Sequence, residues 1–289
     1  MKQIIILLFL SVPFAVFSQQ TDSISAINSL QEIVISQYHV NDSLLNAPAS
    51  IGKLSAAMIQ RSNNTDISPV LNTIPGVYMQ SGGINTNRIS IRGIGARTPY
   101  GTNKIRAFYG SIPLTSGDSE TTIEDIDIEI LGSMEIIKGP LSSIYGAGLG
   151  GAILLTPKIA DTKHTEASIS STIGSFGLLK NTIAVQSGGE KADFNLSYHK
   201  LETDGWRQNS AYNREGVTLA GRLLKTQHSA LTYFGNYTKL KAYIPSSIDK
   251  ETYDNNPQAA APTWLASQGY EKYDSYMGGL AYNWQIASW

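Results

Sequence analysis

The sequence predicts a mainly β protein, in which a compact α+β domain is followed by about six antiparallel strands of a transmembrane β-barrel. Three observations predict this fold. The N-terminus has a short apolar stretch typical of an exported chain, residues 165–289 alternate between apolar and polar side chains, and the connections between those strands are alternately short and long. Six strands cannot close such a barrel, so we interpret them as the beginning of a larger one of about 22 strands.

Residues 1–18 have the features of a secretory signal peptide. Lys2 supplies the positive charge, residues 4–16 are almost entirely apolar, and Val16 and Ser18 stand at the positions expected before a cleavage site. This apolar run is shorter than the roughly 20 residues that a transmembrane helix needs. No later stretch is apolar enough for a helical span, so a membrane role requires strands.

The composition excludes several function classes. The 22 Lys and Arg residues nearly balance the 23 Asp and Glu residues, which gives no electrostatic reason to expect a nucleic-acid partner. The chain has no Cys, and its four His residues are scattered without a helical pair, so we expect neither a metal site nor a cofactor. No Ser stands in a nucleophile-elbow pattern, and we expect no catalytic residues and no enzyme activity.

Residues 19–46 form a polar segment, expected to be flexible, with one apolar island. The β-branched sequence EIVIS, residues 32–36, favours an extended strand. It has no strand partner nearby in the sequence. It therefore pairs either with a distant part of the chain or with another protein.

Residues 47–158 are interpreted as the α+β domain. We expect short helices at 55–61 and 67–73, the second with Asp66 or Ser68 as its N-cap and Pro69 in its first turn. Residues 123–131 fit a helix or a loop equally well. The strands that apolar patterning predicts in this domain are 88–92, 105–109, 134–137 and 152–156.

Residues 165–289 are interpreted as barrel strands because each alternating run has nearly the length of a transmembrane strand. The runs are 166–174, 179–187, 192–199, 214–224, 229–240 and 275–284. A soluble β-sandwich also alternates and is the competing interpretation.

The connections favour the barrel. Residues 188–191 and 225–228 make short turns, whereas 202–213 and 242–270 make longer polar loops. Outer-membrane barrels likewise have short periplasmic turns and long extracellular loops. We also expect an aromatic girdle near the strand ends, formed by Tyr198, Trp206, Tyr212, Tyr237 and Trp284.

One sequence motif resembles a known family. Residues 134–146, MEIIKGPLSSIYG, followed by GGAI at 150–153, resemble the plug-domain signature of TonB-dependent outer-membrane receptors. Residues 74–77 and 88–93 resemble two further plug motifs in the same order. A fourth, at 107–114, has Tyr109 where the family usually has Asp. The resemblance covers about residues 30–158 and extends weakly to 204–210.

A dinucleotide-binding motif is a competing interpretation of the same region. Gly146, Gly148 and Gly151 fit the pattern G-x-G-x-x-G, which must open a helix in a βαβ unit. Residues 152–156 are instead strand-like and stop before Pro157. We therefore expect these glycines to serve tight backbone turns.

The resemblance implies roles for particular residues. Glu32, Ile33, Val34, Ile35 and Ser36 would be the TonB box, with a tethering strand of the plug as the alternative.

Arg92 and Lys138 would lock the plug by pairing with acidic residues on the barrel wall. Lys138 replaces the more usual Arg and loses its bidentate geometry. The alternative is an ordinary solvated surface charge for each.

Ligand contacts are expected in the loops 80–85, 97–103 and 115–120. The candidates are Gln80, Arg97, Tyr100 and Ser116. An Arg close to a Tyr suits an anionic or aromatic ligand, such as a catecholate or carboxylate chelate. The same residues also suit a polar loop that binds nothing.

The resemblance implies active uptake of a scarce ligand across the outer membrane of a Gram-negative bacterium. The expected partners are a TonB-type periplasmic energy-coupling protein, a ferric siderophore and outer-membrane lipid, around a monomer. About 28 mature residues precede the plug, which disfavours a signalling or sandwich domain and favours a small chelate. Importers of cobalamin, haem, glycan or peptide stay open, as does a passive or structural barrel. We expect that the 289-residue chain alone does not insert as a closed barrel.

Overall fold

The computed structural model describes residues 34–35, 42–43, 49–84, 87–96, 102–117, 120–140, 145–146, 148–160 and 163–284. The chain divides into two units, residues 1–33 and 34–289, and the described residues all belong to the second. The expected signal peptide therefore lies outside them. Within the described ranges, no helix is long and apolar enough to cross a membrane.

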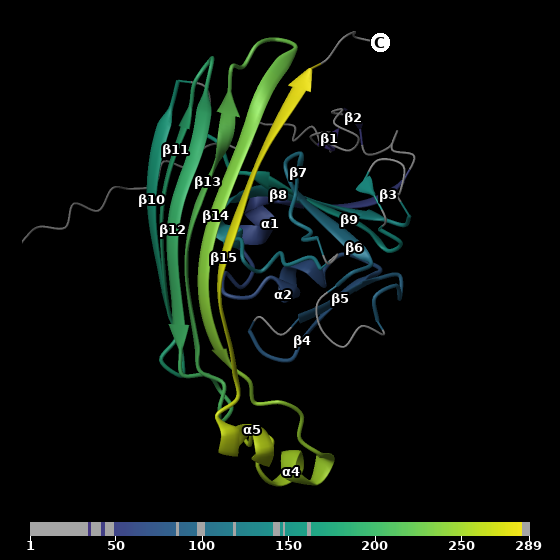
Figure 1. The fold of residues 1–289 in the computed structure, drawn as a ribbon, viewed down its shortest axis with the longest axis vertical. Coiled ribbons are helices and arrows are strands. Elements are labelled where there is room, and N and C mark those ends of the chain that lie inside the picture. Colours follow the sequence, from purple (N-terminus) through teal and green to yellow (C-terminus); the bar gives the residue numbers. More distant parts are fainter. Residues whose placement is uncertain are drawn as a thin grey trace, which may run out of the picture. The chain divides into compact units, whose positions relative to one another are not determined.

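The N-terminal domain contains a five-stranded sheet and a separate hairpin (Figure 1). All pairs in the sheet are antiparallel except β6 with β9, and all the strands predicted in this domain are confirmed. Residues 123–131 are mostly loop and end in a short 3-10 helix. The sheet order is β3 (Ser50–Ser55), β8 (Leu131–Lys138), β9 (Gly151–Pro157), β6 (Ile105–Tyr109) and β7 (Ile112–Pro113), and the hairpin is β4 (Val77–Ser81) with β5 (Asn87–Ile91).

Both predicted helices of this domain are present but short: α1 (Ala56–Gln60) and α2 (Ser68–Leu71), with the 3-10 helix η3 at Ile128–Ile130. The Ser55 side chain accepts a hydrogen bond from the Met58 amide at 3.4 Å and caps α1. At α2, Asp66 Oδ1 accepts from the Ser68 amide at 2.8 Å. The N-cap of α2 is Ile67, so the prediction of Asp66 or Ser68 at that position is wrong: Asp66 precedes the N-cap and Ser68 is the first helical residue.

The second part of this unit is a sheet of six sequential antiparallel strands, as predicted (Figure 1). The loop between the last two strands contains two helices that the sequence did not predict, α4 (Lys250–Asn255) and α5 (Pro262–Ser267). The strands are β10 (Thr165–Ile173), β11 (Leu179–Gly188), β12 (Asp193–Thr203), β13 (Tyr212–Leu223), β14 (Ser229–Tyr243) and β15 (Tyr270–Trp284).

One face of this sheet is apolar and exposed. The strand register places six side chains in one continuous row across it: Ile169, Ile183, Tyr198, Val217, Tyr237 and Tyr276. Two residues further along the strands, the next row of the same face is charged: Lys200, Glu215, Lys239 and Asp274. The charged row marks one edge of the apolar band, and the tyrosines line that edge as a girdle would.

The predicted aromatic girdle needs correction in its details. Tyr198 and Tyr237 lie in the middle of their strands, because these strands continue beyond the apolar band. Tyr212 faces the other side of the sheet and is buried, so it is not part of a girdle. Trp206 lies in a loop between two strands, and Trp284 ends β15 with an exposed side chain.

The opposite face of the sheet is polar and buried. It carries Lys180, Thr182, Asn195, Ser197, His199, Arg214, Thr218, Asn236 and Thr238. A soluble sandwich buries its apolar face and exposes its polar one, and here the relation is reversed. Apolar side chains outside and polar ones inside are the pattern of a membrane barrel wall, and the sandwich interpretation is wrong.

The apolar band predicts where a charge cannot be placed. Leu219 lies within this band. In the full-length protein, Leu219→Arg should destabilise the barrel in bilayers, which means that the free energy of unfolding falls by about 2–4 kcal/mol. Lys239→Arg, in the charged row of the same face, is the matched control and should have no measurable effect. Urea titration of vesicle-inserted protein measures both, and equal stability of the two variants would contradict a lipid-facing band.

Candidate functional site

A buried lysine joins the six-stranded sheet, which we call the wall, to the N-terminal domain. Lys180 lies on β11, its side chain has no exposed surface, and its Nζ lies 2.7 Å from Asp127 Oδ1 and 2.8 Å from Glu129 Oε2. The same Nζ donates to the backbone carbonyl of Asn64 at 2.6 Å. Three acceptors thus match the three donors of the ammonium group, which is the condition for burying a charge.

Neighbouring hydroxyl groups complete this ion cluster. Thr182 Oγ1 lies 2.8 Å from Asp127 Oδ2 and 2.9 Å from Glu129 Oε2, and Ser170 Oγ donates to Glu129 Oε1 at 2.8 Å. Lys180 and Thr182 are two residues apart on one strand and therefore point to the same face.

The lysine sets the protonation of the two carboxylates. Burial alone would raise the pKa of Asp127, but the adjacent Lys180 charge outweighs it and holds that pKa at about 2. Burial likewise raises the pKa of Glu129, and the charge and hydrogen bond of Lys180 bring it below its usual value. Both acids are therefore ionised at neutral pH, and the cluster carries one more negative than positive charge.

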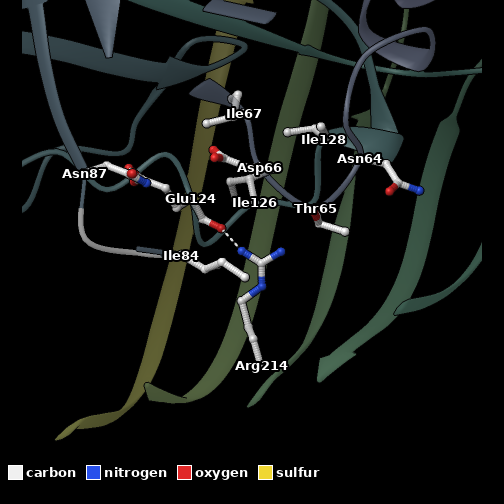
Figure 2. Close-up of a pocket in the computed structure, with 10 residues that line it drawn as sticks. All are labelled: Asn64, Thr65, Asp66, Ile67, Ile84, Asn87, Glu124, Ile126, Ile128 and Arg214. Carbon is white, nitrogen blue, oxygen red and sulfur yellow. Dashed lines mark hydrogen bonds between the residues drawn. The ribbon is translucent and has the colours of Figure 1, made fainter. Parts of the chain in front are cut away.

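The residues just before Asp127 bind the wall as well. Arg214 of β13 donates to the main-chain carbonyl of Glu124, at the edge of a small cavity of about 20 Å3 (Figure 2). Asp125 accepts from Tyr273 Oη of β15 at 2.8 Å through its carboxylate, and from Thr238 Oγ1 of β14 at 3.2 Å through its main-chain carbonyl. We call residues 124–129 the anchor segment. It has hydrogen bonds to β10, β11, β13, β14 and β15.

Apolar contacts reinforce this attachment at a different place. Tyr109, at the end of β6, is buried and packs on Phe234 of β14 with ring centroids 4.5 Å apart. A side chain larger than hydrogen at Gly279 of β15 would collide with Ile112. The Tyr that replaces the usual Asp of the motif at 107–114 therefore serves as a contact with the wall.

A second, larger cavity of about 650 Å3 is also lined by Glu124, together with Asp125. The hairpin β4–β5, the loop before the anchor segment, the start of β15 and α5 all contribute to its lining. Burial raises the pKa of Glu124 and that of Asp125, partly offset by their hydrogen bonds to Asn87 and Tyr273.

The two predicted lock residues do not reach the wall among the described residues. Lys138 Nζ donates to the backbone carbonyl of Pro75 at 3.1 Å. The Arg92 side chain is exposed, and its backbone, at φ +51°, donates to the Gly76 carbonyl at 2.7 Å. Pairing of Arg92 and Lys138 with acids elsewhere on a complete barrel stays a prediction.

The two predicted ligand residues that the structure describes, Gln80 and Ser116, make separate local hydrogen bonds. Gln80 Oε1 accepts from Arg88, and Ser116 Oγ donates to the Glu120 carbonyl at 3.1 Å. Arg97 and Tyr100 lie outside the described residues.

Of the predicted TonB box, only Val34–Ile35 is described, as β1, which pairs antiparallel with β2 (Asp42–Ser43). Glu32, Ile33 and Ser36 lie outside the described residues.

Sequence reasoning missed the ion cluster, although a signal was present. Lys180 lies on β11 two residues before the inward-facing Thr182, and Asp127 and Glu129 stand two apart in the segment that fitted a helix or a loop equally well. A lysine on the inward phase of a barrel strand needs an acidic partner, and these two were candidates.

The family comparison agrees with this architecture. Residues 43–153 match the family described as TonB-dependent Receptor Plug Domain. Residues 43–153 are thus a TonB-dependent receptor plug domain, and the strands that follow resemble those of a receptor barrel. The N-terminal domain is hereafter called the plug, and the six-stranded sheet is called the barrel wall.

Two curated relatives extend the comparison. The iron-regulated outer membrane virulence protein of Vibrio cholerae is 31% identical over 111 residues, which are 37% of this chain and 17% of that protein. The probable TonB-dependent siderophore receptor PiuA of Acinetobacter baumannii is 23% identical over 234 residues, covering 78% of this chain and 28% of PiuA. The chain thus spans less than a third of the length of these relatives.

A solved structure shares the fold. The unliganded ferric citrate transporter FecA aligns with a TM-score of 0.65 and 17% identity, covering 83% of this chain and 38% of FecA. At this identity the match supports the fold and carries no information about the ligand.

The ion cluster predicts a large effect of removing its cation. In the full-length receptor, Lys180→Met leaves Asp127 buried without its partner and should destabilise the plug–wall attachment by about 3–5 kcal/mol. Limited proteolysis of the plug under urea measures this. Adding Asp127→Asn should recover part of the loss. Lys200→Met, on the outer face, is the matched control, and an equal effect of both lysine variants would contradict the assignment.

The same cluster predicts a pH dependence. The pKa of Asp127 is lowered from 3.8 to about 2, so its contribution to stability is present at higher pH and is lost as the pH falls through about 2. The stability difference between the wild type and Asp127→Asn should be constant from about pH 5 to about pH 8 and shrink by about 2 kcal/mol toward about pH 2. Urea titrations at each pH measure it. A difference that does not change with pH would exclude the ion pair.

Proposed function

We propose that the chain is part of an outer-membrane receptor of a Gram-negative bacterium that actively imports a scarce ligand, a ferric siderophore. The observation that carries the proposal is the attachment of the plug to the wall through the anchor segment. Releasing the plug would break a buried ion cluster and hydrogen bonds to five strands, and separating the buried charges would leave them uncompensated. Opening such a lumen requires work from outside, which fits an energy-coupled importer better than a passive pore.

The segment before the plug supports a point where that work is applied. Val34–Ile35 forms a strand of two residues whose partner, Asp42–Ser43, is equally short. Pairing this brief can be exchanged for pairing with another sheet, because main-chain hydrogen bonds depend little on side chains. We assign the partner as a TonB-type periplasmic protein, which would grip residues 32–36 and pull on the plug.

The ligand class rests on the relatives. PiuA is described as a probable siderophore receptor, and the Vibrio cholerae protein as iron-regulated. Both names concern iron, and we extend this ligand class to the present chain. We propose that the receptor works as a monomer surrounded by outer-membrane lipid.

Deleting residues 30–36 from the full-length receptor tests active transport. Uptake of labelled ferric siderophores by whole cells should fall to background, because the handle is lost, while binding of the same ligands to the cell surface is retained. Replacing residues 21–27 with an equally long Gly/Ser sequence is the control and should leave uptake unchanged. Uptake that survives the deletion would favour a passive barrel, and uptake of cobalamin or haem instead would replace the ligand class.

A further inference from the structure

The motif at 204–210, DGWRQNS, lies in the loop between β12 and β13. Two of its side chains, Arg207 and Asn209, bind the much longer loop between β14 and β15, residues 244–269. The two loops are neighbours because β13 pairs with both β12 and β14. The motif thus holds a part of the chain that lies 35 to 60 positions further along the sequence.

Arg207 joins the two limbs of the long loop. Its Nη1 donates to the Ser246 carbonyl at 2.8 Å, and its Nε and Nη2 donate to the Ala259 carbonyl at 3.1 and 2.7 Å. The planar fork of an arginine presents donors in several directions at once, which allows one side chain to bridge both limbs. The acceptors are main-chain atoms, so this contact depends on the path of the loop and not on its side chains.

Asn209 closes the base of the same loop. Its Nδ2 donates to the Ile244 carbonyl at 2.8 Å and to the Gly269 carbonyl at 3.0 Å. The Ile244 amide also donates to the Gly269 carbonyl, at 3.0 Å, so the two ends of the loop are held together. Asn209 has a φ of +52°, a conformation that Asn adopts more readily than most residues. We call Arg207 and Asn209 the clasp.

The long loop is built so that its shape depends on the clasp. Its helices, α4 and α5, contribute no buried residue (Figure 1). The buried positions of the loop are Pro245 and residues 259–261, which flank the carbonyls that Arg207 binds. Ser246 and Gln268, near the two ends of the loop, have φ of +56° and +48°, and such conformations persist only where the surrounding structure enforces them. Without the clasp, a segment of this kind is expected to open locally.

The loop contributes two residues to the wall of the larger cavity, Ile244 and Trp264. A side chain larger than hydrogen at Gly269 would collide with the indole ring of Trp264, so this ring packs directly on the end of the loop. Because Asn209 binds the carbonyls of Ile244 and Gly269, it fixes the backbone on which the indole rests.

We propose that Arg207 and Asn209 are positioning residues, which hold the long loop in one conformation before the imported ligand arrives. A wall that is already formed does not have to be ordered during binding, so the free energy of ordering does not reduce the affinity. The loop is then a fixed part of the receptor and not a lid that closes over the ligand. The inference rests on the proposed function and assigns to residues 244–269 a fixed place in it.

Trypsin measures whether the loop is held. Lys250 is the only Lys or Arg in residues 244–269 and its side chain is 87% exposed, so cleavage after it reports local opening of the loop. In the purified full-length receptor, Arg207→Ala should speed this cleavage at least about tenfold, the loss expected for hydrogen bonds to a charged group. Arg207→Lys should give a smaller increase, because an ammonium group lacks the fork that reaches both limbs.

Two further variants show whether the effect is local. Asn209→Asp keeps the size of the side chain but replaces the donating amide with an oxygen that repels the carbonyls, and it should also speed cleavage. Arg222→Ala is the matched control, because Arg222 binds Asp193 at the opposite end of β13, and it should leave the rate unchanged. Cleavage at the wild-type rate in both Arg207 variants would overturn the proposal, and so would an equal increase in the control.

Uptake separates positioning from a purely structural role. With labelled ferrichrome and ferrioxamine B as probes on whole cells, Arg207→Lys should raise the half-saturating concentration several-fold and leave the maximal rate unchanged. A fall in the maximal rate alone would overturn the assignment. Adding either ferric chelate to the wild-type receptor should not change cleavage after Lys250, and slower cleavage would identify the loop as a lid.

The clasp and the proposed function fail separately in these experiments. No uptake of any ferric chelate, together with faster cleavage of Arg207→Ala, would refute the proposed function and support the clasp. Uptake of a ferric chelate, together with cleavage that is insensitive to Arg207→Ala, would refute the clasp and leave the proposed function intact.

Discussion

The fold depends on the need to bury one lysine. Lys180 projects from β11 into a region without solvent, and its charge is balanced only by Asp127 and Glu129 of the plug. A barrel wall with a polar inner face requires a polar partner, because each buried polar group needs a hydrogen bond. The plug supplies that partner through a short stretch of chain, in which Asp127 and Glu129 both reach Lys180.

The distribution of charge distinguishes this attachment from the one expected from the sequence. The expected lock placed bases on the plug, at Arg92 and Lys138, and acids on the wall. In the described residues the polarity is reversed, with acids on the anchor segment and bases at Lys180 and Arg214 of the wall. The two arrangements do not exclude each other, since they would engage different strands of a complete barrel.

The strands were predictable from sequence because their alternation reflects a physical difference between two environments. Phe194, Leu196 and Tyr198 face outward and Asn195 and Ser197 face inward, so the pattern is strong in each strand. The plug signature was predictable for a similar reason, since its glycines need backbone conformations that other residues avoid.

The site was less predictable because its members are far apart in sequence. Asp127 and Lys180 are separated by 53 residues, and nothing local to either one indicates the other. The helices α4 and α5 were missed because they lack any buried residue, so they leave no apolar periodicity.

The anchor segment connects the cavity to the ion cluster through very few bonds. Asp125 lines the cavity, Asp127 binds Lys180, and only Ile126 separates them. Ile126 is 1% exposed and belongs to the plug core, so its side chain is closely packed. Asp125 and Asp127 are therefore held on one short stretch of packed chain. A ligand that interacts differently with the attached and the released plug would change the free energy of release by that difference, and by the same amount plug release would change its affinity.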